Sequence, residues 1–136
     1  MRGLNTKKIS TLIQRQTQKG GTMHVKVLIK RDMIAGKEED FLSNLKNLRI
    51  KAMNQKGYIS GETLICVEDT NKVTVISLWE TLEDWNNWKT NKKRIEIDDL
   101  LNELQEKPTE YEPYVYSKYW AAASLGFPRP IQEQKL

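Results

Sequence analysis

Residues 58–79 read YISGETLICVEDTNKVTVISLW, which is two strand-like runs joined by a polar turn. Valine, isoleucine and threonine recur at alternate positions of both runs, and Asp-Thr-Asn at 69–71 favours a turn, so the stretch predicts an antiparallel hairpin. Both sides of the second run are apolar, with Val73, Val75 and Trp79 on one side and Ile76 and Leu78 on the other. A strand that is apolar on both faces needs a cover on each, and this requirement decides the architecture.

The residues before the hairpin predict a strand and a helix. Residues 24–32, HVKVLIKRD, alternate β-branched and other residues and predict the first strand. A helix of about five turns follows, because its apolar residues recur with helical spacing, and Gly57 is its expected end. These apolar residues are Phe41, Leu45, Leu48 and Ala52.

The residues after the hairpin predict two helical runs and a last strand. Thr81 and Asp84 form a capping-box pattern that opens a helix with Leu82, Trp85 and Trp88 on one face. A break in the helix is expected near Thr90–Asn91. The second run places Ile97, Leu100, Leu101 and Leu104 on one face and ends before Pro108. Residues 109–120 are rich in tyrosine and predict a strand.

This order predicts an α+β fold, ferredoxin-like βαββαβ, with helices on one face of an antiparallel sheet. The other face would then be a large apolar patch, which monomers seldom expose, so we expect a homodimer joined through the sheet faces. Residues 121–136 show no periodicity and are interpreted as a tail that covers this face or as an arm that reaches the partner.

Length and charge indicate one domain, at 23–120, preceded by a basic, disordered leader at 1–22. The chain has 136 residues and a net charge of +4, but five basic and no acidic residues lie in the leader. Removing these five from the 22 basic residues leaves 17 against 18 acidic residues. The domain therefore lacks the basic face that nucleic-acid binding requires, and it holds no apolar run long enough for a membrane span.

The chain has one cysteine, Cys66, and one histidine, His24. A single cysteine forms no internal disulfide, and the leader lacks the apolar core of a secretory signal, so the expected compartment is the cytoplasm. No metal-ligand cluster, phosphate-binding loop or Ser-His-Asp set is present in the sequence, and no metal site is predicted.

Residues 23–116 resemble the antibiotic biosynthesis monooxygenase family, whose members form dimeric α+β barrels. The resemblance rests on HVKVLIKRDMIAGKEEDF, GYISGETL, VTVISLWETLEDWNNW and PTEYEPYVY. It is strongest in SLWETLEDWNNW, because this family ends that strand with a tryptophan and places aromatic residues on the next helix. Some members oxidise polycyclic phenols or quinols with molecular oxygen and no cofactor, and others degrade haem.

The resemblance implies a cofactor-independent monooxygenase that oxidises a small aromatic or quinol-like substrate. An electron-rich phenolate in a dry apolar pocket can itself react with oxygen, and aromatic walls suit such a substrate. Trp79 is the candidate catalytic residue, and buried core packing is the alternative interpretation. The candidate pocket residues are Phe41, Tyr58, Trp85, Trp88, Asn87 and Lys30.

Two other functions are weighed against this one. Haem-degrading members use an asparagine on the first strand, a tryptophan ending the third and a histidine on a later helix. Only Trp79 matches, because Lys30 occupies the first position and no histidine follows His24. The second alternative is a non-catalytic small-ligand-binding or regulatory dimer on the same fold, since fold does not fix function.

Overall fold

The computed structural model describes Lys8 and residues 24–116. Its elements are β1 (Val25–Asp32), α2 (Glu38–Ala52), β2 (Tyr58–Ile65), β3 (Lys72–Trp79), α3 (Leu82–Lys89), α4 (Lys92–Asn102) and β4 (Glu110–Val115). The predicted βαββαβ order and the α+β, ferredoxin-like class are confirmed. Apart from Lys8, the predicted leader at 1–22 and the tail at 121–136 lie outside the described residues.

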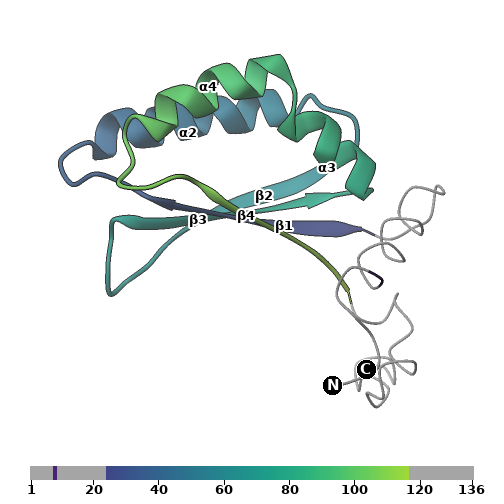
Figure 1. The fold of residues 1–136 in the computed structure, drawn as a ribbon, viewed down its shortest axis with the longest axis horizontal. Helices are drawn as coiled ribbons and strands as arrows, with labels where there is room; N and C mark the ends of the chain where they lie inside the picture. The colour runs from purple at the N-terminus through teal and green to yellow at the C-terminus, as the bar shows by residue number, and fades with distance from the viewer. Residues whose placement is uncertain (1–7, 9–23, 117–136) are drawn as a thin grey trace, which may run out of the picture.

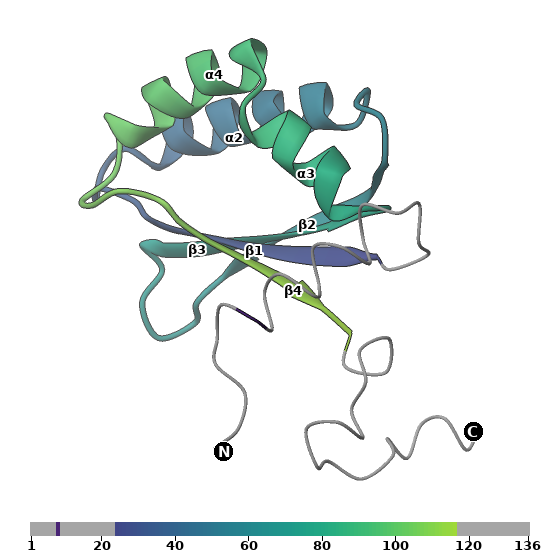
Figure 2. The same cartoon turned by 45° about the vertical axis from the view of Figure 1, so that its right-hand side comes forward.

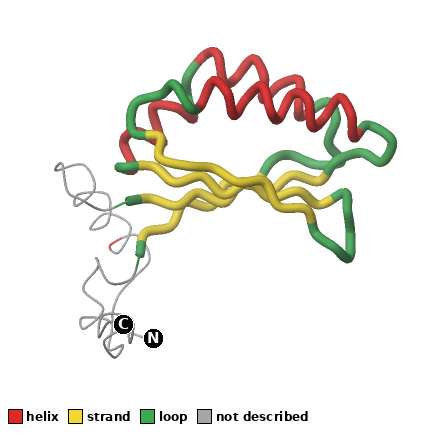
Figure 3. The backbone as a smooth tube through the Cα atoms, turned by 180° about the vertical axis from the view of Figure 1, so that it is seen from behind, coloured by secondary structure: helices red, strands yellow, loops and turns green. Residues whose placement is uncertain are grey.

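The four strands form one antiparallel sheet in the order β2-β3-β1-β4. The three helices of residues 24–116 lie on the same face of this sheet, and α4 packs beside α2 (Figures 1 and 2). From behind, the tube trace shows the same two layers, helices above and strands below (Figure 3). No described helix covers the other face.

The core lies between these layers and comes from alternate residues of the central strands. Val25, Val27 and Ile29 of β1 are buried toward the helices, as are Val73 and Val75 of β3. From α2, the four apolar residues predicted to share one face, Phe41, Leu45, Leu48 and Ala52, are all buried.

The break predicted near Thr90–Asn91 divides α3 from α4. Thr81 Oγ1 accepts a hydrogen bond from the Asp84 backbone N–H at 3.0 Å, so the predicted cap starts α3. Asn91 Oδ1 accepts from the Lys93 N–H at 2.8 Å and starts α4. Each helix thus begins with a side chain that satisfies a backbone donor.

One predicted core position on α4 is wrong. Leu100 is 50% exposed, whereas the buried residues of this helix are Arg94, Ile97 and Leu101. The buried positions follow the spacing i, i+3 and i+7, so the inward face is defined by Arg94 rather than by Leu100. Arg94 can occupy the first position of this buried face because its guanidinium has partners inside the protein.

One predicted boundary also differs, and a bulge changes the face of one residue; both differences position the site. Helix α2 ends at Ala52, five residues before the expected stop, and Gly57 instead has a φ of 85° in the turn before β2. A bulge then interrupts the β2–β3 register between Tyr58 and Ser60. Strict alternation places Tyr58 away from the helices, but the bulge sets it opposite Trp79 on the helix side.

The open face of the sheet has an apolar centre. Leu28 of β1 pairs with Ile76 of β3, and Leu78 lies two residues after Ile76 on the same face of β3. All three are partly buried within the described chain, and Lys26, Lys30, Glu62 and Glu112 surround them. Within the described residues, no helix is long and apolar enough to cross a membrane.

Candidate functional site

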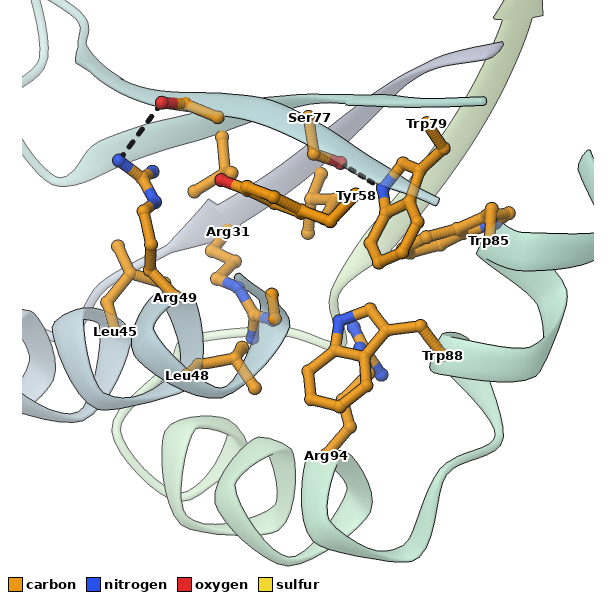
Figure 4. A pocket seen from close by; sticks show the side chains of 14 residues that line it. Arg31, Leu45, Leu48, Arg49, Tyr58, Ser77, Trp79, Trp85, Trp88 and Arg94 are labelled. Atoms are coloured by element: carbon orange, nitrogen blue, oxygen red, sulfur yellow. Dashed lines mark hydrogen bonds between the residues drawn. The ribbon is translucent and has the colours of Figure 1, made fainter. Parts of the chain in front are cut away.

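A cavity lies between the sheet and the helices, against β3 and the bulged start of β2 (Figure 4). The space open to the centre of a water molecule is about 40 Å³, which corresponds to roughly three waters. The cavity is lined by Ile29, Arg31, Leu45, Leu48, Arg49, Ala52, Tyr58, Gly61, Val75, Ser77, Trp79, Trp85, Trp88 and Arg94.

Aromatic rings form one wall of this cavity. The rings of Tyr58 and Trp79 meet edge to face, with centroids 5.4 Å apart and planes at 87°. The ring centroids of Trp79 and Trp85 are 6.0 Å apart. Trp88 points into the cavity from α3 (Figure 4). The indole N–H of Trp79 donates to Ser77 Oγ at 3.1 Å, two residues earlier on the same face of β3. This bond fixes the ring of Trp79, whose side chain is fully buried.

The structure brings four of the seven predicted site residues together at the cavity: Tyr58, Trp79, Trp85 and Trp88. The other three lie elsewhere. Phe41 is fully buried in the core but does not line the cavity, and Asn87 is exposed on α3. Lys30 lies on the open face, where its ammonium pairs with Glu112 at 3.2 Å.

Three arginines line the cavity, and none of them was among the candidate site residues. Arg49 on α2 donates to the Gly61 carbonyl at 3.3 Å and to Thr63 Oγ1 at 2.6 Å, so its guanidinium bridges the helix and β2. Arg94 on α4 stacks against Trp85, with its guanidinium carbon 5.6 Å from the ring centroid. Arg94 shares the helical spacing of Ile97 and Leu101, and this spacing was the signal in the sequence that could have placed it on the buried face of α4.

Arg31 is the third arginine, and it is almost fully buried at 2% exposure. It continues the inward-facing series of β1, so the alternation that buries Ile29 also buries this side chain. Its Nη1 donates to Gln105 Oε1 at 2.9 Å and to Thr109 Oγ1 at 3.0 Å. Its Nη2 lies 2.9 Å from Asp98 Oδ1.

Several polar atoms of this ion pair remain unsatisfied. The Arg31 Nη2–Asp98 Oδ1 contact has ion-pair distance but not the direction of a hydrogen bond, so both atoms lack a hydrogen-bond partner among the described residues. The Nε of Arg31 likewise has no hydrogen-bond partner in the described part of the chain. A buried donor of this kind is costly unless something accepts from it.

No residue lining the cavity, all of them within 24–116, is an acid or a histidine. Four acids on or beside the strands lie outside the cavity: Asp32 pairs with Lys107 at 3.1 Å, and Glu62, Glu68 and Glu80 are exposed. Burial raises the pKa of Tyr58 above its ordinary value of 10, and nearby Arg49 opposes this. Tyr58 is therefore a neutral phenol at pH 7, and its hydroxyl can both donate and accept a hydrogen bond.

Metal-binding and haem-binding groups are sparse in the described structure. No three histidine, cysteine or acidic side chains within residues 24–116 are grouped to hold a metal ion. His24 precedes β1, and neither His24 nor the half-buried, free Cys66 lines the cavity.

Comparison with known proteins gives a family. The model of the antibiotic biosynthesis monooxygenase family matches residues 24–95, more than half of the chain. This match covers β1 to the beginning of α4 and so includes the cavity wall formed by Tyr58, Trp79, Trp85 and Trp88. No curated protein matches the chain.

Solved structures share the fold at low sequence identity. A conserved protein from Methanosarcina mazei Go1 is similar with a TM-score of 0.65 at 22% identity, over 68% of this chain and 92% of that one. SnoaB, a cofactor-independent oxygenase from Streptomyces nogalater, has a TM-score of 0.63 at 14% identity, over 69% and 93%. A Shewanella oneidensis protein has a TM-score of 0.63 at 15% identity, over 71% and 93%.

Proposed function

The chain belongs to the antibiotic biosynthesis monooxygenase family, and we propose that it is a cofactor-independent monooxygenase that oxidises a small aromatic or quinol-like molecule with molecular oxygen. The observation that carries this proposal is the aromatic cavity. Tyr58, Trp79, Trp85 and Trp88 come from three elements and share one space. The fold shared with the oxygenase SnoaB is consistent with the proposal.

The charge of the lining supports oxidation of an ionised substrate. Three guanidinium groups and no carboxylate line the cavity within the described residues. Positive charge near a phenol favours its anion, so the arginines would promote ionisation of the substrate without a protein base. The substrate anion supplies electrons to oxygen. Oxidation of a ring CH₂ to a carbonyl consumes one O₂ and releases one water, which balances the four electrons transferred.

The decisive measurement is oxygen uptake by chelator-treated protein with anthrones, naphthols and quinols. Trp79→Leu is compared with Phe41→Leu, because both replace a fully buried ring but only Trp79 lines the cavity. We expect saturable uptake that falls about tenfold in Trp79→Leu, the cost of an aromatic wall contact, and changes less than about twofold in Phe41→Leu. Circular dichroism checks that both variants fold.

Equal losses in both variants would assign Trp79 to packing alone. Binding of aromatic molecules without oxygen uptake would instead favour a non-catalytic ligand-binding or regulatory dimer. The absence of an acid or histidine from the described lining is the observation that favours this second function.

The proposal includes a homodimer joined through the open sheet face, where Leu28, Ile76 and Leu78 form the apolar centre. Apolar patches that a chain leaves partly uncovered mark interfaces. We also place the protein in the cytoplasm, which agrees with the free thiol of Cys66.

A further inference from the structure

Almost all the residues that line the cavity are buried, and the exceptions show where a molecule can enter. The three tryptophans of the lining are only 0–3% exposed. Arg49, Tyr58 and Gly61 are the partly exposed residues, and every other residue of the lining is buried. Arg49 belongs to α2, and the other two belong to β2. The mouth of the cavity, as the described residues define it, therefore lies between α2 and β2.

Arg49 lies across this mouth. Its Nη1 donates to the Gly61 carbonyl at 3.3 Å, and its Nη2 donates to Thr63 Oγ1 at 2.6 Å (Figure 4). Both bonds run from α2 to β2, so the guanidinium spans the space between the two elements. The bond to Thr63 is exposed to solvent. Because water can replace either partner of such a bond, its loss costs little free energy.

Tyr58 covers the rest of the mouth, and it can do so because position 61 has no side chain. The hydroxyl of Tyr58 points toward Arg49 (Figure 4). A Cβ added at Gly61 would lie 2.5 Å from this hydroxyl oxygen and 3.4 Å from Arg49 Nε. The φ of Gly61 is not positive, so the close approach of these two side chains, and not the backbone conformation, accounts for the glycine.

The cavity is too small in this closed form for an aromatic molecule. It has room for roughly three waters, about 40 Å³, whereas a cavity known to bind benzene measures about 150 Å³. The strand beside the mouth is restrained from one side, because β2 has β3 as its one neighbouring strand in the described sheet. The bulge between Tyr58 and Ser60 interrupts even this pairing. A ring can therefore reach the tryptophans only after the mouth opens.

We propose that Arg49 and Tyr58 form a gate, which opens when Arg49 releases Gly61 and Thr63. Only the identity of the entering molecule, an aromatic substrate, rests on the proposed function. The gate lies on the helix side of β2, away from the open sheet face. Arg49 is thus a residue that controls the entry of substrate and its permitted size, and it is not a catalytic residue.

The test is acrylamide quenching of tryptophan fluorescence in the full chain carrying Trp120→Phe. Trp120 lies outside the described residues, and the other three tryptophans all line the cavity. Acrylamide is a small neutral probe that must pass the mouth to reach them. Arg49→Met keeps a long unbranched side chain but removes both hydrogen bonds. It should raise the quenching constant about fivefold, the change in open population that the loss of one hydrogen bond produces.

Gly61→Ala tests the gate without removing any of its groups. The added Cβ must displace the Tyr58 hydroxyl, which the free end of a side chain can accommodate, so this variant should fold and also be quenched more strongly. Lys46→Met is the matched control for Arg49→Met, because Lys46 is exposed on α2 and does not line the cavity. Phe41→Leu is the control for stability, since it removes a buried ring outside the lining.

Stronger quenching in Arg49→Met and Gly61→Ala, with both controls unchanged, is the expected result. No increase in Arg49→Met would overturn the gate. An equal increase in Phe41→Leu would also overturn it, because access would then follow stability. The measurement needs no turnover. Oxygen uptake with unchanged quenching would refute the gate alone, and stronger quenching without any oxygen uptake would refute the proposed oxygenase alone.

Discussion

Arg31 and Arg49 show how the same side chain serves two purposes in one cavity. The guanidinium of Arg49 is occupied by the Gly61 carbonyl and Thr63, and it ties α2 to β2. Arg31 has its Nη1 bonded to Gln105 and Thr109 but keeps Nε without a partner among the described residues. Arg49 therefore joins two elements of the cavity wall, and Arg31 keeps one buried donor without an acceptor among the described residues.

We expect Tyr58 to lose its proton at a higher pH than an ordinary tyrosine. Burial raises its pKa above 10, so the folded state holds this proton more tightly than the unfolded chain does. The free energy of unfolding is therefore unaffected by this group below pH 10 and falls as the pH rises through the folded-state pKa. Tyr58→Phe should lose less stability above pH 10 than the wild type, as measured by urea unfolding at a series of pH values.

The tyrosinate absorbance gives an independent check on Tyr58. The difference between wild type and Tyr58→Phe isolates one of the five tyrosines of the chain. This difference should develop above pH 10. If it is complete at or below pH 10, the positive charge of Arg49 outweighs burial, and Tyr58 would be available as an anion in the cavity.

The aromatic part of the site could be predicted from the sequence, but its charged part could not. The tryptophans of α3 share a face through helical spacing, and Trp79 ends a strand of clear alternation. Arg31 also follows this alternation, but a charged residue near a strand end is ordinarily assigned to the surface. Its burial depends on Asp98 and Gln105 in a distant part of the chain, and no local pattern reveals such partners.

At the scale of elements, the segment between α2 and β2 determines where the cavity wall begins. The hairpin, the Thr81 cap and the order of the elements along the chain follow from local patterns, because alternation and capping depend on neighbouring residues. The bulge between Tyr58 and Ser60 does not, since an extra residue in one strand is recognisable only from its pairing with the other. This bulge moves Tyr58 into the site.

Gly57 holds this segment against α3, and its replacement should be costly. Its φ is 85°, and a Cβ added there would collide with the carboxylate of Asp84, which is buried at the start of α3. Gly36 is the matched control: its φ is 89°, but an added Cβ would have no neighbour within 4 Å. Gly36→Ala should cost about 1 kcal/mol of unfolding free energy for the backbone conformation alone.

Gly57→Ala should cost at least about 2 kcal/mol, because steric overlap adds to the same conformational cost. Urea unfolding of the two variants measures both values. Equal losses would mean that α3 moves away from Gly57 without penalty, and the start of β2 would then not be fixed by this contact.

At the scale of the whole molecule, the two faces of the sheet differ in what covers them. The helices bury Val25, Val27 and Trp79 completely, whereas Leu28, Ile76 and Leu78 on the open face are only partly buried by the described chain. Charged side chains surround this apolar centre in the cross-strand rows, including the Lys30–Glu112 pair. An apolar centre with a polar rim is the usual composition of an interface.

The homodimer is tested by changing a leucine on each layer. The wild-type chain should have a mass of about twice 15.9 kDa in light scattering after size exclusion. Leu78→Glu should halve this mass, because it places a carboxylate from each subunit in the apolar centre of the interface. Leu100→Glu is the control, since Leu100 is half exposed on α4, and it should remain dimeric. Dissociation by Leu100→Glu instead would place the interface on the helices, and a monomeric wild type would leave the open face to a different cover.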